Sequence, residues 1–238
     1  MRIMSEHLDD GLDRLKTPSF YEPVKNAECA EWYIARLTPG GWTVGLYVPK
    51  GFEAYVRIPH PRWKQVPQPA PGAIFYHGSW RRPVPFDTDQ QAHVADVGQL
   101  IGPWADVLFE TLGEVSSSFD ERCICGLWEG YNVDRPATAR FEIGMSLGFL
   151  LYRASRNAIA QSLSAHRMPC PTNVPSMIWP EDRSWCVITP FQFFSTYLAG
   201  PQKLIDRLLD RRNEIDVRVV HLDDELIKII GGRMYGQA

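Results

Sequence analysis

The sequence lacks the common signatures of nucleotide binding. Neither the phosphate-loop pattern G-x-x-x-x-G-K nor the dinucleotide fingerprint G-x-G-x-x-G occurs in the 238 residues. These patterns bring backbone N–H groups close to phosphate oxygens, and nothing else in the chain resembles them. We therefore expect no cofactor. Their absence leaves open whether the protein is an enzyme.

The chain also lacks a long apolar run and a strong excess of charge of one sign. No run approaches the roughly 20 apolar residues of a membrane-spanning helix, and the start, MRIMSEHLDDGLDRLK, has no apolar core of the secretory kind. Lys and Arg number 25 against 28 Asp and Glu, a net charge of −3, whereas nucleic-acid binders usually show a basic excess. We expect a cytoplasmic protein that binds neither membranes nor nucleic acids.

The five cysteines are an odd number without the spacing of a secreted disulfide scaffold. In a reducing compartment they would be free thiols, and those within apolar segments are typical of small buried side chains. Cys123 and Cys125 fall on one face of a predicted strand. However, no second C-x-x-C or H-x-x-x-H pattern completes a tetrahedral metal set. We expect no metal site.

Aromatic residues are abundant, with 8 Trp, 9 Tyr and 11 Phe in a chain that is 45% hydrophobic, which indicates a globular protein with a sizeable core. Strand-like runs come in pairs with helical segments between the groups, not in strict alternation. This order predicts an α+β fold with a mostly antiparallel sheet and flanking helices. We expect a single domain at residues 26–238, preceded by a polar N-terminal arm at residues 1–25.

Hydrophobic periodicity and turn residues predict the elements of this domain. The prolines of residues 59–72 exclude a central strand there, and residues 141–152 are ambiguous, with a buried strand favoured over a helix. Strands are expected at 42–48 and 52–58 (a hairpin), 73–80, 122–128, 184–189, 193–198 and 217–221, and helices at 26–37, 87–113 with a break at 102–103, 158–164, 201–212 and 223–230. The predicted core comprises Trp42, Val56, Ile58, Ile124, Leu127, Leu147, Leu150, Trp185, Val187, Leu204 and Leu208.

Residues 176–200 hold the densest mixture of charge and aromatic residues in the chain. Within them we expect an ordered loop that carries Trp179, Glu181, Asp182 and Arg183 and leads into a strand. Arg183 offers a planar fork for a carboxylate or a phosphate. The alternative is a structural loop, in which Asp182 accepts a bond from a backbone N–H two residues on and Arg183 pairs locally.

A second aromatic and acidic loop is expected at the end of the strand at 122–128, with Trp128, Glu129 and Tyr131. His60 follows the predicted strand at 52–58, at a strand end where functional side chains are often presented. If these loops converge, they form an aromatic-walled, acid-lined cleft suited to a sugar, a cation or a basic peptide. The alternative for His60 is a histidine that is hydrogen-bonded at the strand end.

Three blocks of the sequence carry a resemblance to a known family: residues 52–61 (FEAYVRIPHP), 126–131 (GLWEGY) and 179–187 (WPEDRSWCV). Their order and spacing resemble those of an uncharacterised family of actinobacterial proteins. The resemblance implies a shared fold and carries no activity. The chain departs from that family at Pro190, near which the family usually has an acidic residue.

Two functions follow from these observations as hypotheses. The first is a non-enzymatic binding module that uses the aromatic and acidic loops to hold a protein partner or a small polar ligand. The alternative is a small hydrolase or transferase, in which Glu129, Glu181 or Asp182 acts as acid or base and His60 or His77 assists. This alternative requires the carboxylates to lie in one cleft.

Overall fold

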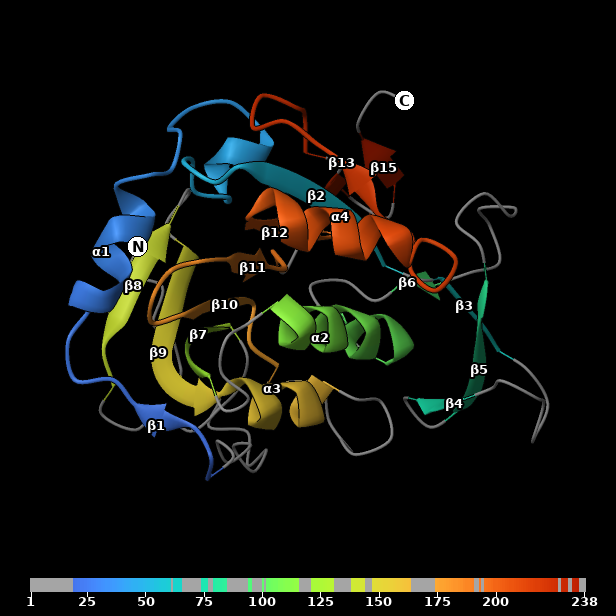
Figure 1. The fold of residues 1–238 in the computed structure, drawn as a ribbon, viewed down its shortest axis with the longest axis horizontal. Coiled ribbons are helices and arrows are strands. Elements are labelled where there is room, and N and C mark those ends of the chain that lie inside the picture. The colour runs from blue at the N-terminus through green and yellow to red at the C-terminus, as the bar shows by residue number, and fades with distance from the viewer. Residues whose placement is uncertain are drawn as a thin grey trace, which may run out of the picture.

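The computed structural model describes residues 19–60, 62–65, 74–76, 79–84, 94–95, 100, 102–115, 121–130, 138–143, 147–163, 174–190, 193, 195–226, 228–230 and 233–235. Their largest unit is a nine-stranded sheet in which all pairings are antiparallel (Figure 1). Helices flank this sheet, so the predicted α+β fold is confirmed. Within the described part of the chain, no helix is both long and apolar enough to cross a membrane.

The strands of the main sheet follow the order β1-β9-β7-β10-β11-β12-β2-β13, and β8 pairs with β9 beside this path. Each pairing joins segments that are neighbours in the chain or are linked by a helix or a long connection. Their bounds are β1 (Glu22–Pro23), β2 (Ala54–Pro59), β7 (Arg122–Trp128), β8 (Arg140–Ile143), β9 (Leu147–Ser155), β10 (Met177–Pro180), β11 (Cys186–Ile188), β12 (Ser195–Gly200) and β13 (Arg218–Val219).

Four α-helices and one 3-10 helix are described: α1 (Glu28–Ile34), η1 (Val44–Leu46), α2 (Pro103–Val115), α3 (Arg156–Leu163) and α4 (Gln202–Asp210). Helices α2, α3 and α4 pack on one face of the sheet, and α1 and η1 cover the other face. The two-residue period of a strand divides its side chains between these layers. In β7, Cys123 and Cys125 face α2 and α3, while Ile124 faces α1.

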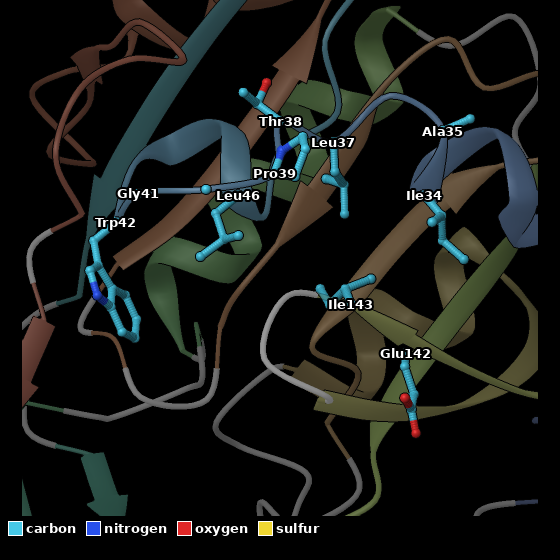
Figure 2. Close-up of a pocket in the computed structure, with 11 residues that line it drawn as sticks. Ile34, Ala35, Leu37, Thr38, Pro39, Gly41, Trp42, Leu46, Glu142 and Ile143 are labelled. Carbon is cyan, nitrogen blue, oxygen red and sulfur yellow. The ribbon is translucent and has the colours of Figure 1, made fainter.

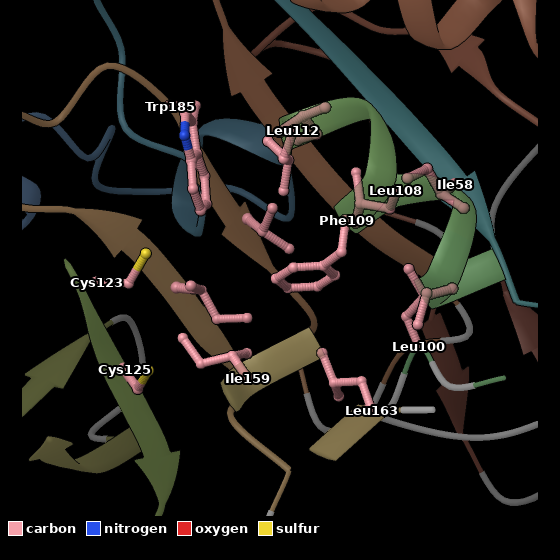
Figure 3. Close-up of a cluster of buried hydrophobic side chains, with 14 of the residues drawn as sticks. Ile58, Leu100, Leu108, Phe109, Leu112, Cys123, Cys125, Ile159, Leu163 and Trp185 are labelled. Atoms are coloured by element: carbon pink, nitrogen blue, oxygen red, sulfur yellow. The ribbon is translucent and has the colours of Figure 1, made fainter. Parts of the chain in front are cut away.

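The core under α2, α3 and α4 is made of aliphatic and aromatic side chains from both layers (Figure 3). Leu108 and Leu112 of α2 and Ile159 of α3 belong to this core, and the two helices contact each other. Of the eleven predicted core residues, nine are buried. The other two, Trp42 and Leu147, are partly buried and pack against the core on the α1 side.

Residues 62–95 contribute a second, four-stranded antiparallel sheet, and the C-terminal segment forms a two-stranded one. The prediction that residues 59–72 hold no central strand is wrong, because the proline-free stretch Arg62–Gln65 lies between two other strands. The single-domain organisation of residues 26–238 stays a prediction. The strands of the second sheet are β3 (Arg62–Gln65), β4 (Ile74–Tyr76), β5 (Ser79–Val84) and β6 (Val94–Ala95), and those of the third are β14 (Lys228–Ile230) and β15 (Arg233–Tyr235).

Two further predictions, the strand at 42–48 and the helix at 223–230, are wrong because the backbone of these segments is hydrogen-bonded differently from what their local sequence indicates. Residues 42–48 contain the short helix η1 (Val44–Leu46) and no hairpin strand, because the N–H groups of Val44 and Gly45 donate to carbonyls of residues 224 and 222. The predicted helix at 223–230 instead includes strand β14. Of the ambiguous residues 141–152, those that the structure describes (141–143 and 147–152) lie in the strands β8 and β9, as favoured.

The fully buried Leu208 of α4 provides a test of this packing, because α4 contacts both α2 and β2. We expect Leu208→Ala to lower the free energy of unfolding by about 2–5 kcal/mol, since it leaves a cavity between these layers. Lys203→Ala, at an exposed position of the same helix, should change it by less than about 0.5 kcal/mol. Denaturant unfolding of both variants measures the difference, and equal effects would contradict the packing of α4.

Candidate functional site

The turn between β10 and β11 brings Arg183 to the surface. Its backbone N–H donates to the Pro180 carbonyl oxygen at 2.9 Å, and Arg183 has a φ of 61°, in the left-handed region that residues with a side chain seldom occupy. Asp182 Oδ1 accepts the N–H of Ser184 at 2.9 Å. This bond to the N–H two residues on was predicted, and it is confirmed; whether Asp182 also binds a partner stays a prediction.

The Arg183 guanidinium lies over the indole of Trp32, a residue of α1. Its Cζ is 5.6 Å from the centroid of the Trp32 ring, and the Cζ of Arg36, one helical turn after Trp32, is 5.7 Å from the same ring. Cation–π contacts of this kind contribute about 0.5–1 kcal/mol at exposed sites. Both arginines are exposed. We call Trp32, Arg36 and Arg183 the arginine–tryptophan cluster.

Aromatic packing beneath the cluster holds the Trp32 ring in place. The Trp179 ring of β10 meets it edge to face at 5.9 Å between centroids, and Phe52 does so at 6.4 Å. The hydroxyl of Tyr33, the next residue in α1, donates to the Tyr47 carbonyl oxygen at 2.5 Å. Only 8% of Trp32 is exposed. The indole is therefore a fixed support for two guanidinium groups.

The carboxylates of the same turn are engaged away from Arg183. Glu181 accepts a bond from Arg153 Nε at 3.1 Å, while Asp182 caps the backbone. Within the described residues, neither Arg36 nor Arg183 forms an ion pair. The backbone N–H of Lys50 donates to the Arg36 carbonyl oxygen, so the two residues are adjacent. The Lys50 side chain is exposed and adds a further positive charge. In the described part of the chain, this surface therefore presents three cations that form no ion pair.

Two residues expected at a binding surface are buried. The expectation that Trp179 is exposed in a loop is wrong, because β10 continues through Pro180 and leaves the Trp179 ring 1% exposed against α1. His60 is also 1% exposed. Its Nε2 is 2.9 Å from Thr196 Oγ1, which in turn lies 2.7 Å from Thr189 Oγ1. The structure therefore agrees with a hydrogen-bonded histidine at a strand end.

The second aromatic and acidic loop begins where β7 ends. Trp128 is half-buried, and Glu129 Oε2 accepts a bond from Arg140 Nε at 2.7 Å. Arg140 also pairs with Glu142 at 2.5 Å. A Cβ at Gly148 would stand 1.8 Å from Glu129 Oε2, so the glycine allows this carboxylate to lie against β9. Tyr131 falls outside the described residues.

The two predicted loops lie at opposite ends of β7 and do not converge. The N–H of Glu181 donates to the carbonyl oxygen of Arg122, the first residue of β7, whereas Glu129 follows its last residue. At about 3.3 Å per residue, the strand separates these ends by roughly 20 Å. His60 follows β2, four strands away from β7 in the sheet. The single cleft required by the hydrolase or transferase hypothesis is not formed by these residues.

A catalytic motif that the sequence analysis overlooked is the G-x-S-x-G pattern of residues 144–148. In α/β-hydrolases this pattern places a nucleophilic serine on a turn from a strand into a helix. Here the pattern falls at the connection between the antiparallel strands β8 and β9. The setting is therefore not that of a nucleophile elbow. Residues 144–146 and His77 lie outside the described part of the chain.

An open groove of about 850 Å³ lies between the end of α1 and β8 (Figure 2). Its walls are mostly apolar, with Ile34, Leu37, Leu46 and Ile143 among them, and Glu142 is the charged residue of the lining. The Ile34 side chain is 45% exposed. Sequence analysis missed this groove, although the Pro-Gly-Gly run after the predicted helix at 26–37 signals an exposed connection. It also missed Trp32 and Arg36, which are one helical turn apart in that helix.

The described cysteines are free thiols, with Cys123, Cys125 and Cys186 buried and Cys29 partly buried. Burial raises the pKa of Cys186 to about 12 and also raises that of Cys125. A thiol with a raised pKa remains protonated near neutrality and is a poor nucleophile. Among the described residues, no three His, Cys, Asp or Glu side chains are grouped as a metal site would require.

Comparison of the chain with known protein families, with curated proteins and with solved structures found no match. The resemblance to an uncharacterised actinobacterial family therefore stays a prediction. The WPEDRSWCV block on which it rests forms the end of β10, the turn that carries Arg183 and the start of β11.

The left-handed backbone at Arg183 predicts a difference between two substitutions that both remove the guanidinium. Arg183→Ala keeps a Cβ at φ 61°, whereas Arg183→Gly relieves that steric conflict. We expect the glycine variant to be more stable than the alanine variant by about 1 kcal/mol in denaturant unfolding. Asp182→Ala should lose about 1 kcal/mol relative to the wild type, through its lost hydrogen bond. A glycine variant less stable than the alanine variant would contradict this geometry.

Burial of the thiols also predicts a loss of stability at alkaline pH. The pKa of Cys186 is about 12 in the folded protein and near its ordinary value in the unfolded chain, so folding favours the protonated thiol. Its contribution is complete below pH 9 and is lost as the pH rises toward 12, with a slope of at most about 1.4 kcal/mol per pH unit. Between pH 9 and 10, the free energy of unfolding should fall less steeply with pH in Cys186→Ala than in the wild type. Cys29→Ala should change this slope less, because the Cys29 thiol is only half-buried.

Proposed function

We propose that the protein is a non-enzymatic binding protein that holds an acidic segment of a protein partner on the arginine–tryptophan cluster. The observation that carries the proposal is the placement of two exposed guanidinium groups over one fixed indole, 5.6 and 5.7 Å from its centroid. Arginine and tryptophan are the residues that most often dominate protein interfaces.

The charge of this surface supports an acidic partner. Arg36, Arg183 and Lys50 are exposed, and Arg153 already neutralises Glu181. A guanidinium can bind a carboxylate through two parallel hydrogen bonds, a geometry that an ammonium group cannot match. A partner carboxylate therefore gains charge-assisted bonds at this surface without displacing an existing ion pair of Arg36 or Arg183.

The cluster is also preorganised, which lowers the entropic cost of binding. The turn is held by two hydrogen bonds: the Arg183 N–H donates to the Pro180 carbonyl oxygen, and the N–H of the next residue, Ser184, donates to the Asp182 carboxylate. The left-handed conformation of Arg183 is the kind of local strain that is frequent at binding sites. Stacking on Trp32 further restricts a side chain that would otherwise sample many rotamers.

We also propose that the protein acts in the cytoplasm. The four described cysteines are free thiols, which is typical of a protein in a reducing compartment.

An acidic protein segment is also a more specific partner for a small surface than a free anion, because it supplies several carboxylates and a backbone to the same interface.

This function is tested with a fluorescein-labelled 12-residue peptide that contains two Asp-Glu pairs, followed by fluorescence anisotropy. We expect binding that weakens with added salt. Arg36→Gln and Arg183→Gln should each reduce the affinity about threefold and the double variant about tenfold, because exposed ion pairs contribute up to about 1 kcal/mol each. Arg212→Gln, which removes an exposed arginine after α4, serves as the matched control.

The proposal is contradicted if the same peptide with Lys in place of Asp and Glu binds equally well. It is also contradicted if Arg212→Gln weakens binding as much as Arg183→Gln does, because attraction would then depend on overall charge and not on the cluster. Thermal unfolding of each variant shows whether a loss of binding reflects a loss of the fold.

A further inference from the structure

The groove beside α1 is continuous with the arginine–tryptophan cluster along the chain. Trp32 and Arg36 belong to the cluster, while Ile34, Ala35 and Leu37 line the groove. These residues alternate over the last turn of α1 and the residues after it. Residues that are two apart in a helix do not face the same side, so the groove and the cluster lie on different sides of the C-terminal end of α1.

We propose that this groove receives an apolar anchor side chain of the same acidic segment, about three to five residues from its carboxylates. The inference rests on the proposed function and specifies its partner. An extended peptide advances about 3.3 Å per residue and a helix with its side chains is about 10–12 Å across, so about three to five residues suffice to pass from one side of the end of α1 to the other. The partner motif is thus an acidic pair followed, at this interval, by a large apolar or aromatic residue.

The chemistry of the groove fits an apolar anchor. Ile34 is one of the two large hydrophobic side chains that are exposed in the described part of the protein, and Figure 2 shows it across the groove from Ile143. A volume of about 850 Å³ falls within the range of pockets that accept small apolar groups. Covering Ile34 removes apolar surface from water and stabilises the complex.

The shape and charge of the rim also admit an acidic segment. Gly40 has a φ of 95° and no atom within 4 Å of the position where a Cβ would lie, so this wall stays low and open. Glu142 would repel the carboxylates of the partner if it were alone. Arg140 pairs with it at 2.5 Å and pairs with Glu129 as well, so one of the two negative charges at the rim is offset, and the apolar anchor, not the carboxylates, lies beside the other.

Three labelled peptides of equal length test the inference by fluorescence anisotropy. The first carries an Asp-Glu pair and a Phe four residues later, the second replaces Phe with Ser, and the third keeps Phe but replaces Asp and Glu with Asn and Gln. We expect the first peptide to bind about fivefold more tightly than the second. Ile34→Ser should abolish that difference and leave the affinity of the second peptide unchanged.

Val219→Ser is the matched control, because Val219 is the other exposed large hydrophobic residue and lies on β13, away from the groove lining. It should change the affinity of none of the peptides. The inference is overturned if Phe adds no affinity, or if Val219→Ser removes as much affinity as Ile34→Ser. It is also overturned if the third peptide binds as tightly as the first, since the groove would then be an independent site for apolar ligands.

These outcomes separate this inference from the proposed function. If the second peptide binds and Arg183→Gln weakens its binding while Phe contributes nothing, the cluster binds acidic segments and only the anchor is refuted. If neither acidic peptide responds to Arg183→Gln, the proposed function itself fails and the inference fails with it. Thermal unfolding of Ile34→Ser and Val219→Ser confirms that both variants are folded.

Discussion

The structure depends on a sheet whose central strands are covered on both faces. Strands β10, β11 and β12 are buried along their entire length. Alternate side chains therefore enter two separate cores, one under α2, α3 and α4 and the other under α1 and η1. Burial on both faces fixes the register, because a shift by one residue would exchange the two sets of side chains. This register in turn determines where the surface turns at the strand ends lie.

This two-sided burial also explains how far the sequence could predict the fold. Elements with local patterns were found correctly: β7 has its predicted bounds, and α4 shows one apolar face around Leu204 and Leu208. Some segments determined by distant partners were not found. Strand β10 has no polar alternation because both of its faces are buried, so its last two residues, Trp179 and Pro180, were interpreted as a loop. Pro180 is tolerated at that strand end.

The candidate site follows the same division between local and distant interactions. The hydrogen bond from Ser184 to Asp182 spans two residues, so the sequence predicted it. The contact between Arg183 and Trp32 joins residues that are far apart in the chain, and no local pattern specifies it. The groove likewise lies between α1 and β8, two elements that are far apart in the chain. The aromatic and acidic composition of the turn indicated recognition, but it did not identify the ring on which the arginine stacks.

The position of Trp179 connects these two levels of structure. Its ring fills the core on the α1 side and forms the edge-to-face contact that supports Trp32. The chain leaves the sheet after Pro180, and the turn that follows places the Arg183 guanidinium over the same indole. The contacts between Trp179, Trp32 and the arginines therefore connect the buried sheet to the exposed guanidinium groups. Because strand β10 is held between two hydrogen-bonded neighbours, the cluster rests on an interior strand of the sheet, which allows a small exposed surface to present its charges without prior reorganisation.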